Sequence, residues 1–305
     1  MNFLPSATAL RCFDASARLG SLTKAAAEVH LTQGAVSQQI LALEQKLGVV
    51  LFIRSKSGLQ LTPAGQTYWT DIAVALKQIE RATQNMMSTK GDGGTLNVSV
   101  ASTFGTYWLM PRLRTFVTAH PEITINLSTQ IGPVDFTNSK SDAAIEFSDG
   151  AKPNLHAELI MPLRLRPYCA SKTAKAPPSK KLLIALLQKS ALIRHTTVLS
   201  GWDGWLAAAS LQTAVDKKHA NNGPQYDLLS MALNAVIEGF GIALLPDYLV
   251  EHALEQQQIT ALSKNYWTSE KAYYLRYPTS KKQLVSLQKF EQWLLSQRHV
   301  EDSSA

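Results

Sequence analysis

The pattern of apolar and polar positions divides the chain at residues 91–94, which read Gly-Asp-Gly-Gly. Before this segment, apolar residues recur at steps of three and four, which predicts helices almost throughout. After it, short β-branched runs alternate with helical stretches, as is typical of an α/β domain. Because glycine-rich segments separate structured parts, we expect a helical N-terminal region and a larger α/β domain over residues 91–305.

Three short helices are predicted in the first 47 residues. The first spans about residues 5–19 and ends at Gly20, and the second spans about 22–30 with Ser21 as its N-cap. The third follows Thr32, a candidate N-cap, and runs to about residue 47. Its expected buried stripe, at steps of four, three and four, is Val36, Ile40, Leu43 and Leu47.

The opposite face of the third helix begins with polar and small side chains, namely Gln33, Gly34, Ser37, Gln38 and Leu41. Glutamine can form a bidentate pair with adenine in the DNA major groove, and serine can bond a base or a phosphate. The glycine allows close approach of the backbone. Taken alone, this face also suits an ordinary solvated surface, so the residues that follow it matter.

Those residues predict a small two-stranded wing. Residues 50–54 read as a strand, residues 55–58 as a turn and residues 59–61 as a returning strand. Arg54 and Lys56 would lie near the tip, where cations hold the DNA backbone or the minor groove. A helix-turn-helix followed by a basic wing favours a winged helix-turn-helix DNA-binding domain over residues 1–62.

The charge distribution supports this interpretation. The 305-residue chain has 30 basic and 23 acidic side chains, a formal charge of +7. Residues 1–62 hold six basic and three acidic side chains, net +3, and residues 91–305 hold 21 and 18, also net +3. The positive charge is therefore several-fold denser in the N-terminal domain, as expected for a partner with a phosphate backbone.

The residues of this segment resemble the N-terminal domain of the LysR-type transcriptional regulators. The matching positions are Leu10-Arg11, Phe13, Ala17, Ser21, Ala25-Ala26, Thr32-Gln33, Ala35-Val36-Ser37, Gln39-Ile40, Leu43-Glu44, Leu47-Gly48, Leu51-Phe52, Arg54, Leu61-Thr62 and Ala64-Gly65. By this resemblance Gln33, Ser37 and Gln38 face the groove, Arg54 lies in the wing, and Thr32 caps the helix and donates to a phosphate.

A long linker helix is predicted over residues 63–90, starting after Thr62 with a proline at its first position. Its apolar positions approach a heptad repeat, comprising Tyr68, Ile72, Ala75, Ile79, Thr83 (or Ala82) and Met86. An exposed helix of this length is marginal alone, so we expect it to pair with a second chain, with packing onto its own domain as the alternative. The resembled family dimerises through this helix and forms tetramers.

The C-terminal region alternates strands and helices, which implies right-handed crossovers and a parallel sheet. It resembles the effector-binding part of the LysR-type regulators, two periplasmic-binding-protein-like lobes around a cleft. The chain would cross between lobes near residues 163 and 268, so that lobe I comprises about 95–162 and 268–297 and lobe II about 163–267. Residues 273–275 would return as a strand to lobe I, and residues 282–297 would form the last helix.

Ligands of such folds bind at the carboxyl ends of the strands. Ser102 and Thr103 lie at such a junction, where two hydroxyls and backbone N–H groups can hold a carboxylate, although hydroxyls there also serve as simple caps. Carried over from the resemblance, the effector-binding residues are Ser102, Thr103, Phe104, Thr129, Glu146, Phe147, Thr197, Tyr226 and Pro246, with Trp202 as either a wall or plain core.

Within the family, the chain is most similar to the glycine-cleavage and β-lactamase-gene activators. The segments that carry this likeness are Trp108-Leu109, Pro111-Arg112-Leu113 with Phe116, Asp142 to Ile145, and His195 with Trp202 and Trp205. The chain departs from that group at Glu146, where an arginine is common. An acidic residue near the cleft weakens an anionic ligand or favours one that carries an amine.

Other classes of protein lack support. No catalytic elbow, zinc-binding HExxH or phosphate-binding loop occurs, and His195 and His252 have no partners at metal spacing, so an enzyme, a metal and a cofactor are not expected. Cys12 and Cys169 are expected to be buried thiols in a reducing cytoplasm rather than a redox pair. Neither a signal peptide nor a membrane span is predicted.

The predicted function is a sequence-specific transcriptional regulator of mixed fold. A small effector, bearing a carboxylate or an amine, would bind between two α/β lobes and change how a homodimer or homotetramer holds double-stranded DNA, with RNA polymerase as a further partner. The alternative is a non-specific architectural DNA binder whose C-terminal domain serves assembly alone.

Overall fold

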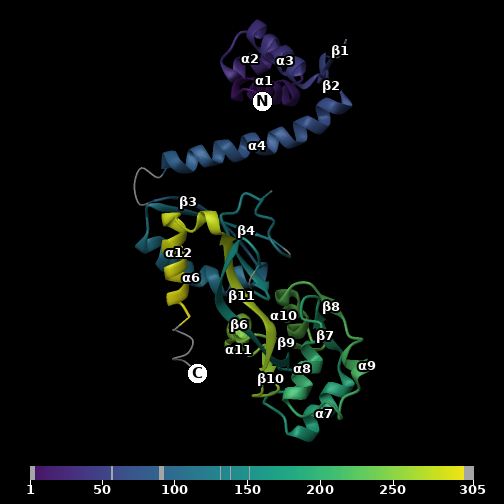
Figure 1. The fold of residues 1–305 in the computed structure, drawn as a ribbon. Helices are drawn as coiled ribbons and strands as arrows, with labels where there is room; N and C mark the ends of the chain where they lie inside the picture. Colours follow the sequence, from purple (N-terminus) through teal and green to yellow (C-terminus); the bar gives the residue numbers. More distant parts are fainter. Residues whose placement is uncertain are drawn as a thin grey trace. The chain divides into compact units, whose positions relative to one another are not determined.

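The computed structural model describes residues 4–55, 58–88, 93–130, 132–137, 139–150 and 152–298. The chain folds as two compact units, Met1–Lys90 and Gly91–Ala305 (Figure 1). The division falls at the glycine-rich segment that separates the two hydrophobic patterns in the sequence.

The N-terminal unit consists of three short helices, a two-stranded sheet and one long helix. Its elements are α1 (Ala7–Leu19), α2 (Leu22–Val29), α3 (Gln33–Leu47), β1 (Phe52–Ser55), β2 (Gly58–Leu61) and α4 (Pro63–Ser88). The three short helices lie within two residues of their predicted bounds. The first strand begins two residues later than predicted, at Phe52.

Local sequence explains where the short helices begin and end. The hydroxyls of Ser6, Ser21 and Thr32 each accept a hydrogen bond from a backbone N–H in the first turn of α1, α2 and α3. Gly20 and Gly48 end α1 and α3 in the left-handed conformation, with φ of 61° and 68°. The first helix starts at Ala7 rather than residue 5 because Ser6 caps it.

The core of this unit lies between the three short helices and the first half of α4. Phe13 is fully buried, with its ring 5.4 Å from that of Phe52 and 5.5 Å from that of Tyr68. Val36, Ile40 and Leu43 are buried as predicted from their spacing. Trp69 of α4 donates from Nε1 to Asp14 Oδ1 at 2.9 Å, which ties the long helix to α1.

The C-terminal unit is a mixed sheet with helices around it. Its strands are β3 (Gly94–Val100), β4 (Ile123–Thr129), β5 (Ala143–Ser148), β6 (Leu155–Ala170), β7 (Leu192–His195), β8 (Gln225–Tyr226), β9 (Ile242–Leu245), β10 (Ile259–Ala261) and β11 (Trp267–Pro278). Its helices are α5 (Ser102–Phe104), the π-helical η1 (Gly105–Leu109), α6 (Met110–Ala119), α7 (Lys180–Lys189), α8 (Gly201–Ala208), α9 (Lys217–Ala220), α10 (Leu229–Ile237), α11 (Asp247–Glu255), the 3₁₀ turn η2 (Thr279–Lys281) and α12 (Val285–Ser296).

Two parallel groups of strands are joined by two long antiparallel strands. The strand order is β4-β3-β5-β11-β6-β9-β7-β8, with β10 paired to β6. Strand β3 is parallel to β4 and β5, and β7 is parallel to β8 and β9. Strand β11 is antiparallel to both β5 and β6. The expected parallel sheet is therefore present in each half, and the whole sheet is mixed because β6 and β11 join the halves.

The two long strands also carry the chain from one half to the other. The first part of β6 pairs with β11, and its last part, Arg166 to Tyr168, pairs with β9. Strand β11 pairs with β6 at Trp267 and Thr268, and reaches β5 at Ala272. Because both strands cross between the halves, a cavity between the halves receives side chains from distant segments.

The last helix covers the side of the sheet that holds β3. Leu287, Phe290 and Leu294 of α12 are buried, and the Phe290 ring lies 5.4 Å from that of Phe116 in α6. The helix starts at Val285 rather than residue 282 because η2 and the residues after it make turns first.

Candidate functional site

The first candidate site is the exposed face of α3. With Val36, Ile40 and Leu43 turned into the core, the opposite face reaches solvent. Of the residues predicted to contact DNA, those exposed are Thr32, Gln33, Gly34, Gln38 and Leu41, and Ser37 is half-buried. The structure thus gathers all six on one accessible surface at the start of the helix.

Local contacts shape this surface. The Thr23 hydroxyl donates to Gln33 Oε1 at 3.2 Å, which orients the side-chain amide of Gln33 at the start of α3. A Cβ added at Gly34 would meet no atom within 4 Å, so the glycine leaves open space there rather than relieving an internal contact. Leu41 is 54% exposed and lies on the same face as the polar residues.

The wing lies beside α3 and is held by it. Glu44 Oε1 accepts from the backbone N–H groups of Leu51 and Phe52 at 2.7 and 3.1 Å, which fixes the start of β1. Strands β1 and β2 are antiparallel, with Arg54 opposite Leu59. Lys56 lies outside the described residues. The predicted two-stranded wing is therefore present. The backbone of Arg54 lies in β1, one position before Ser55, the last residue of that strand.

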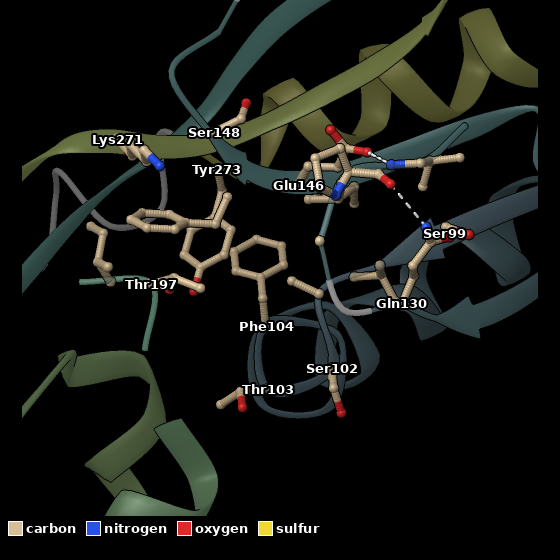
Figure 2. Close-up of a pocket in the computed structure, with 18 of the residues that line it drawn as sticks. Ser99, Ser102, Thr103, Phe104, Gln130, Glu146, Ser148, Thr197, Lys271 and Tyr273 are labelled. Atoms are coloured by element: carbon tan, nitrogen blue, oxygen red, sulfur yellow. Dashed lines mark hydrogen bonds between the residues drawn. The ribbon is translucent and has the colours of Figure 1, made fainter. Parts of the chain in front are cut away.

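The second candidate site is a cavity of about 380 Å³ in the C-terminal unit, shown in Figure 2. It lies at the carboxyl ends of the parallel strands β3 and β5, as expected for this class of sheet. Residues after β7 and at the start of α10 close its other side. Its volume suits a small molecule.

Six of the ten predicted effector-binding residues line this cavity: Ser102, Thr103, Phe104, Glu146, Phe147 and Thr197. The other four lie outside its lining. Thr129 is exposed at the end of β4, Tyr226 is half-buried in β8, and Pro246 is buried where α11 starts. Trp202 is core, because it is 2% exposed and donates from Nε1 to Ile193 O at 2.9 Å.

Other lining residues were not predicted, and they come mainly from strand ends and from β11: Ser99, Gln130, His195, Asp227, Lys271, Tyr273 and Arg276. Lys271 and Tyr273 alternate along β11, so a period of two would have placed them on one face once the strand was aligned. The sequence gives no signal that Arg276 lines the cavity, because an arginine in a strand is usually expected to face solvent.

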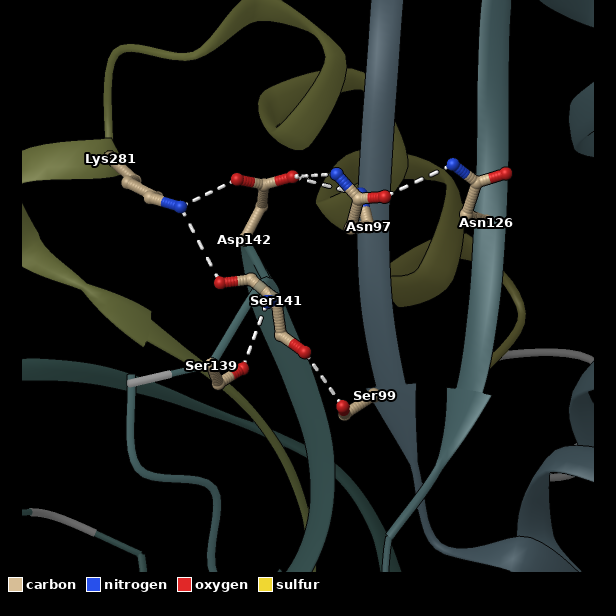
Figure 3. A network of polar contacts seen from close by, with 7 residues as sticks. All are labelled: Asn97, Ser99, Asn126, Ser139, Ser141, Asp142 and Lys281. Atoms are coloured by element: carbon tan, nitrogen blue, oxygen red, sulfur yellow. Dashed lines mark hydrogen bonds and ion pairs between the residues drawn. The ribbon is translucent and has the colours of Figure 1, made fainter. Parts of the chain in front are cut away.

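A polar network holds β3 between its neighbours, just before the cavity residues (Figure 3). Buried Asp142 accepts from the Asn97 backbone N–H and Nδ2, both at 2.9 Å, and Lys281 Nζ donates to its other oxygen at 2.5 Å. Asn126 Nδ2 donates to Asn97 Oδ1 at 3.0 Å. Because each oxygen of the buried carboxylate has donors, the network aligns the strand that leads to Ser102 without leaving an unpaired charge.

Two contacts beside the cavity join the segment after β3 to helices α10 and α11. The Thr103 hydroxyl lies 3.4 Å from both the hydroxyl and the backbone nitrogen of Ser230 in α10. Phe104 stacks on Tyr273 with a centroid distance of 4.2 Å and meets the ring of Tyr248 edge-on at 5.8 Å. Ser102 and Thr103 lie together below this aromatic pair in Figure 2. The hydroxyl of Thr103 is thus already in contact with Ser230 of α10.

Burial keeps two titratable groups of the cavity neutral. The phenol of Tyr273 has its pKa raised to about 12 by burial, and its hydroxyl lies 2.9 Å from that of Tyr248. Burial also lowers the pKa of His195 below its ordinary value, against the opposing effect of Asp227. The Thr197 backbone N–H donates to His195 Nδ1 at 3.2 Å, so the neutral ring carries its proton on Nε2.

Glu146 enters the cavity as one half of an ion pair. It is 7% exposed, and its Oε1 accepts from the Val134 backbone N–H at 2.5 Å. Its Oε2 accepts from Arg276 Nη1 at 2.8 Å. The expected repulsion of an anionic ligand by Glu146 is therefore reduced, because a cation from β11 compensates its charge.

Within the part of the chain that the structure describes, no group of three His, Cys, Asp or Glu side chains is placed to hold a metal ion. Cys12 and Cys169 are both buried and form no disulfide, and burial raises the pKa of Cys169 to about 11. No helix in the described ranges is long and apolar enough to cross a bilayer.

A helix-turn-helix unit with a wing, followed by an α/β unit around a small-molecule cavity, defines a ligand-responsive DNA-binding regulator. Residues 7–66 match the family described as "Bacterial regulatory helix-turn-helix protein, lysR family", and residues 89–298 match "LysR substrate binding domain". The chain belongs to the LysR family of transcriptional regulators.

Named relatives extend over nearly the whole chain. The glycine cleavage system transcriptional activator of Escherichia coli K12 is 32% identical over 304 residues, covering 98% of this chain and 95% of that protein. The regulator BlaA of Proteus vulgaris is 32% identical over 294 residues, covering 95% of each. The solved effector domain of AmpR from Pseudomonas aeruginosa is 27% identical, with a TM-score of 0.61 over 69% of this chain and 98% of that chain.

These similarities confirm the predicted family, fold class and function. The protein is a DNA-binding transcriptional regulator with an effector-binding domain. They favour this function over the architectural alternative, because relatives that match both units are transcriptional activators. These relatives are named as transcriptional regulators.

Proposed function

We propose that the chain reads operator bases through the first two turns of α3 and responds to a small effector in the cavity between its lobes. The observation that carries this proposal is the exposed face of α3, where Gln33, Gly34 and Gln38 reach solvent opposite the buried Val36, Ile40 and Leu43. Leu47, the last position of the predicted stripe, is half-buried. Ser37 and Leu41 would contact the same groove.

In this proposal each group on the N-terminal unit has a distinct role. Gln33 and Gln38 pair with base edges, and Gly34 allows the helix backbone to come close to the groove floor. Thr32 and the wing residues Arg54 and Lys56 contact phosphates or the minor groove, which positions the helix without reading sequence. Thr23 supports Gln33 through the hydrogen bond to its amide oxygen.

We propose that the chain acts as a homodimer or homotetramer joined through α4. Val74 and Ile79 are 40% and 60% exposed on this helix, although its first half packs on the core of its own unit. Apolar residues left in solvent along a long helix indicate a partner helix. A dimer also matches DNA half-sites about one or two helical turns apart.

The proposed effector bears a carboxylate or an amine and contacts Ser102, Thr103, Phe104, Glu146, Phe147 and Thr197, which line one cavity. Contacts such as Thr103 to Ser230 bridge the lobes, so a ligand that replaces or strengthens them biases two arrangements of the lobes. That bias would pass to the subunits and alter the bound DNA. RNA polymerase is the proposed further partner, and a reducing cytoplasm the proposed setting.

The test of base reading uses duplexes selected from a random pool by the full-length protein. Gln33→Ala is compared with the matched Gln45→Ala, which removes an exposed glutamine from the last turns of α3. Competition binding against a scrambled duplex measures discrimination. We expect Gln33→Ala to lower operator discrimination by about tenfold, since one bidentate base pair contributes about 1–3 kcal/mol.

Gln45→Ala is expected to leave discrimination within twofold, and Lys56→Ala to weaken operator and scrambled duplexes alike. Equal losses on both duplexes for Gln33→Ala would contradict its role in base reading. An unselective wild type would contradict the proposed function itself.

A further inference from the structure

Arg276 lies in β11 among the residues that line the cavity, and it is 1% exposed. Its Nη1 donates to Glu146 at 2.8 Å. Its Nε and Nη2 are buried and have no hydrogen-bond partner among the described residues. A guanidinium has five N–H groups in one plane. In Arg276 the Nη1 group has a hydrogen-bond acceptor, whereas the N–H groups of Nε and Nη2 have none among the described residues.

The two unsatisfied nitrogens share one edge of the guanidinium. Nη1 lies on the same side as Cδ, so the N–H of Nε and one N–H of Nη2 point in parallel away from it. Two parallel N–H groups match the two oxygens of a carboxylate, which is the bidentate geometry preferred by arginine. Glu146, fixed by the Val134 N–H, sets the orientation of this edge.

Buried charged donors rarely remain without acceptors, because each costs its full desolvation free energy. The cavity's own carboxylates, Glu146, Asp149 and Asp227, provide no acceptor for Nε or Nη2. The unsatisfied edge therefore requires an acceptor that the described part of the chain does not supply. Arg276 is also one of the residues that line the cavity, so the cavity is the space from which we expect such an acceptor to come.

We propose that the effector carries a carboxylate and that this group accepts from the Nε and Nη2 edge of Arg276. This inference rests on the proposed function, which places the effector in this cavity. Lys152 and Lys271, both exposed in the lining, offset the negative charge that the ligand adds beside Glu146. Phe147, Leu163 and Val198 provide an apolar surface for the rest of the molecule, so the class is a small organic acid with an apolar body.

The test is a titration of the full-length protein with benzoate, isobutyrate and glycine, beside the uncharged benzamide and isobutyramide and the cation benzylamine. Thermal shift screens the compounds, and calorimetry gives their affinities. Arg276→Lys keeps the positive charge beside Glu146 but removes the two-pronged edge. Arg166→Lys is the matched control, because Arg166 is likewise paired with a carboxylate, donating from its Nε to Asp247, and does not line the cavity.

We expect at least one of the acids to stabilise the wild type and its amide to have no effect. Arg276→Lys should bind that acid at least tenfold more weakly, and Arg166→Lys within twofold of the wild type. If Arg276→Lys does not fold, the double variant Glu146→Gln/Arg276→Gln, which keeps a buried polar pair without charge, should show the same loss.

Three results would overturn the proposal. The first is equal binding of acid and amide, which a water molecule on Arg276 would produce. The second is binding of benzylamine alone, which would assign the anchor to Glu146. The third is the absence of any shift with the acids. Operator discrimination by the wild type is measured separately, so none of these three results contradicts sequence-specific DNA binding. Absence of operator discrimination by the wild type would contradict the proposed function.

Discussion

At the scale of single residues, the surroundings of each side chain in the cavity decide its charge. His195 is half-buried, and burial lowers its pKa from the ordinary value of 6.5. Glu146 and Arg276 form a buried ion pair at 2.8 Å. A ligand in the cavity would therefore meet the neutral imidazole of His195 and an ion pair whose two charges compensate each other. Such surroundings favour a ligand whose hydrogen-bonding groups match the positions of these side chains, rather than any ligand of a given charge.

The lowered pKa of His195 predicts a pH dependence of stability. Below about pH 6.5 the unfolded chain takes up a proton that the folded chain does not, so the free energy of unfolding falls as pH falls from 6.5 to the lower folded value. Above about 6.5 this residue adds no pH dependence. His195→Asn keeps an acceptor for the Thr197 N–H but cannot titrate.

Urea unfolding of the full chain between pH 8 and pH 5 measures this difference. The wild type should lose more stability on acidification than His195→Asn. His252→Asn, which removes a largely exposed imidazole, should follow the wild-type profile. Identical profiles for the wild type and His195→Asn would contradict the role given to burial.

At the scale of elements, α4 combines two functions along its length. Tyr68, Trp69, Ile72 and Leu76 pack against the core of the N-terminal unit, so the alternative of packing onto its own domain holds for this half. Farther along, Ala75, Ile79 and Thr83 of the predicted heptad face solvent, and the side chain of Met86 lies outside the described residues. The exposed half is the part left for a partner chain.

Ile79→Glu tests that assignment. A charge placed at an apolar helix contact loses the burial of the isoleucine and desolvates the carboxylate, so the dimer dissociation constant should rise at least tenfold. The matched control is Lys77→Glu, which places the same charge at an exposed polar position two residues away. Sedimentation velocity over a concentration series measures association, and equal effects of the two variants would rule out a specific seam at Ile79.

At the scale of the whole molecule, the charge of +7 matters through its position. The 62 N-terminal residues hold net +3, the same excess as the 215 residues after residue 90. Lys24 is exposed on α2, the first helix of the helix-turn-helix, which in such motifs commonly crosses the DNA backbone. The positive charge is therefore concentrated in the N-terminal unit, which carries the DNA-binding domain.

This distribution predicts a strong salt dependence of DNA binding. For a dimer that neutralises about six phosphates, the plot of log affinity against log salt concentration should have a slope of about −5. Lys24→Gln should make this slope shallower by about 1 for each phosphate that the lysine neutralises, and Lys264→Gln, an exposed lysine of the C-terminal unit, should not change it. Fluorescence anisotropy at about 50 to 200 mM salt gives the slope. Equal salt-dependence slopes for Lys24→Gln and Lys264→Gln would contradict the prediction that the charge of the N-terminal unit contacts DNA phosphates.

The N-terminal unit was largely predictable, because its signals are local. Ser21, Thr32, Gly20 and Gly48 cap helices through contacts within a few residues, and the stripe of α3 follows from the helical period. The start of α1 was two residues off because Ser6 competes with Pro5 as the beginning of the helix.

The sequence by itself determined the helical head, the wing, the long helix and the alternation of the larger unit, since periodicity and capping act over a few residues. Only the tertiary structure decided the chemistry of the cavity. It pairs Glu146 with Arg276 across 130 positions, engages Thr103 with Ser230 across 127, and leaves Thr129, Trp202, Tyr226 and Pro246 out of the lining. Such contacts depend on how β11 returns beside β5, and no local pattern encodes that register.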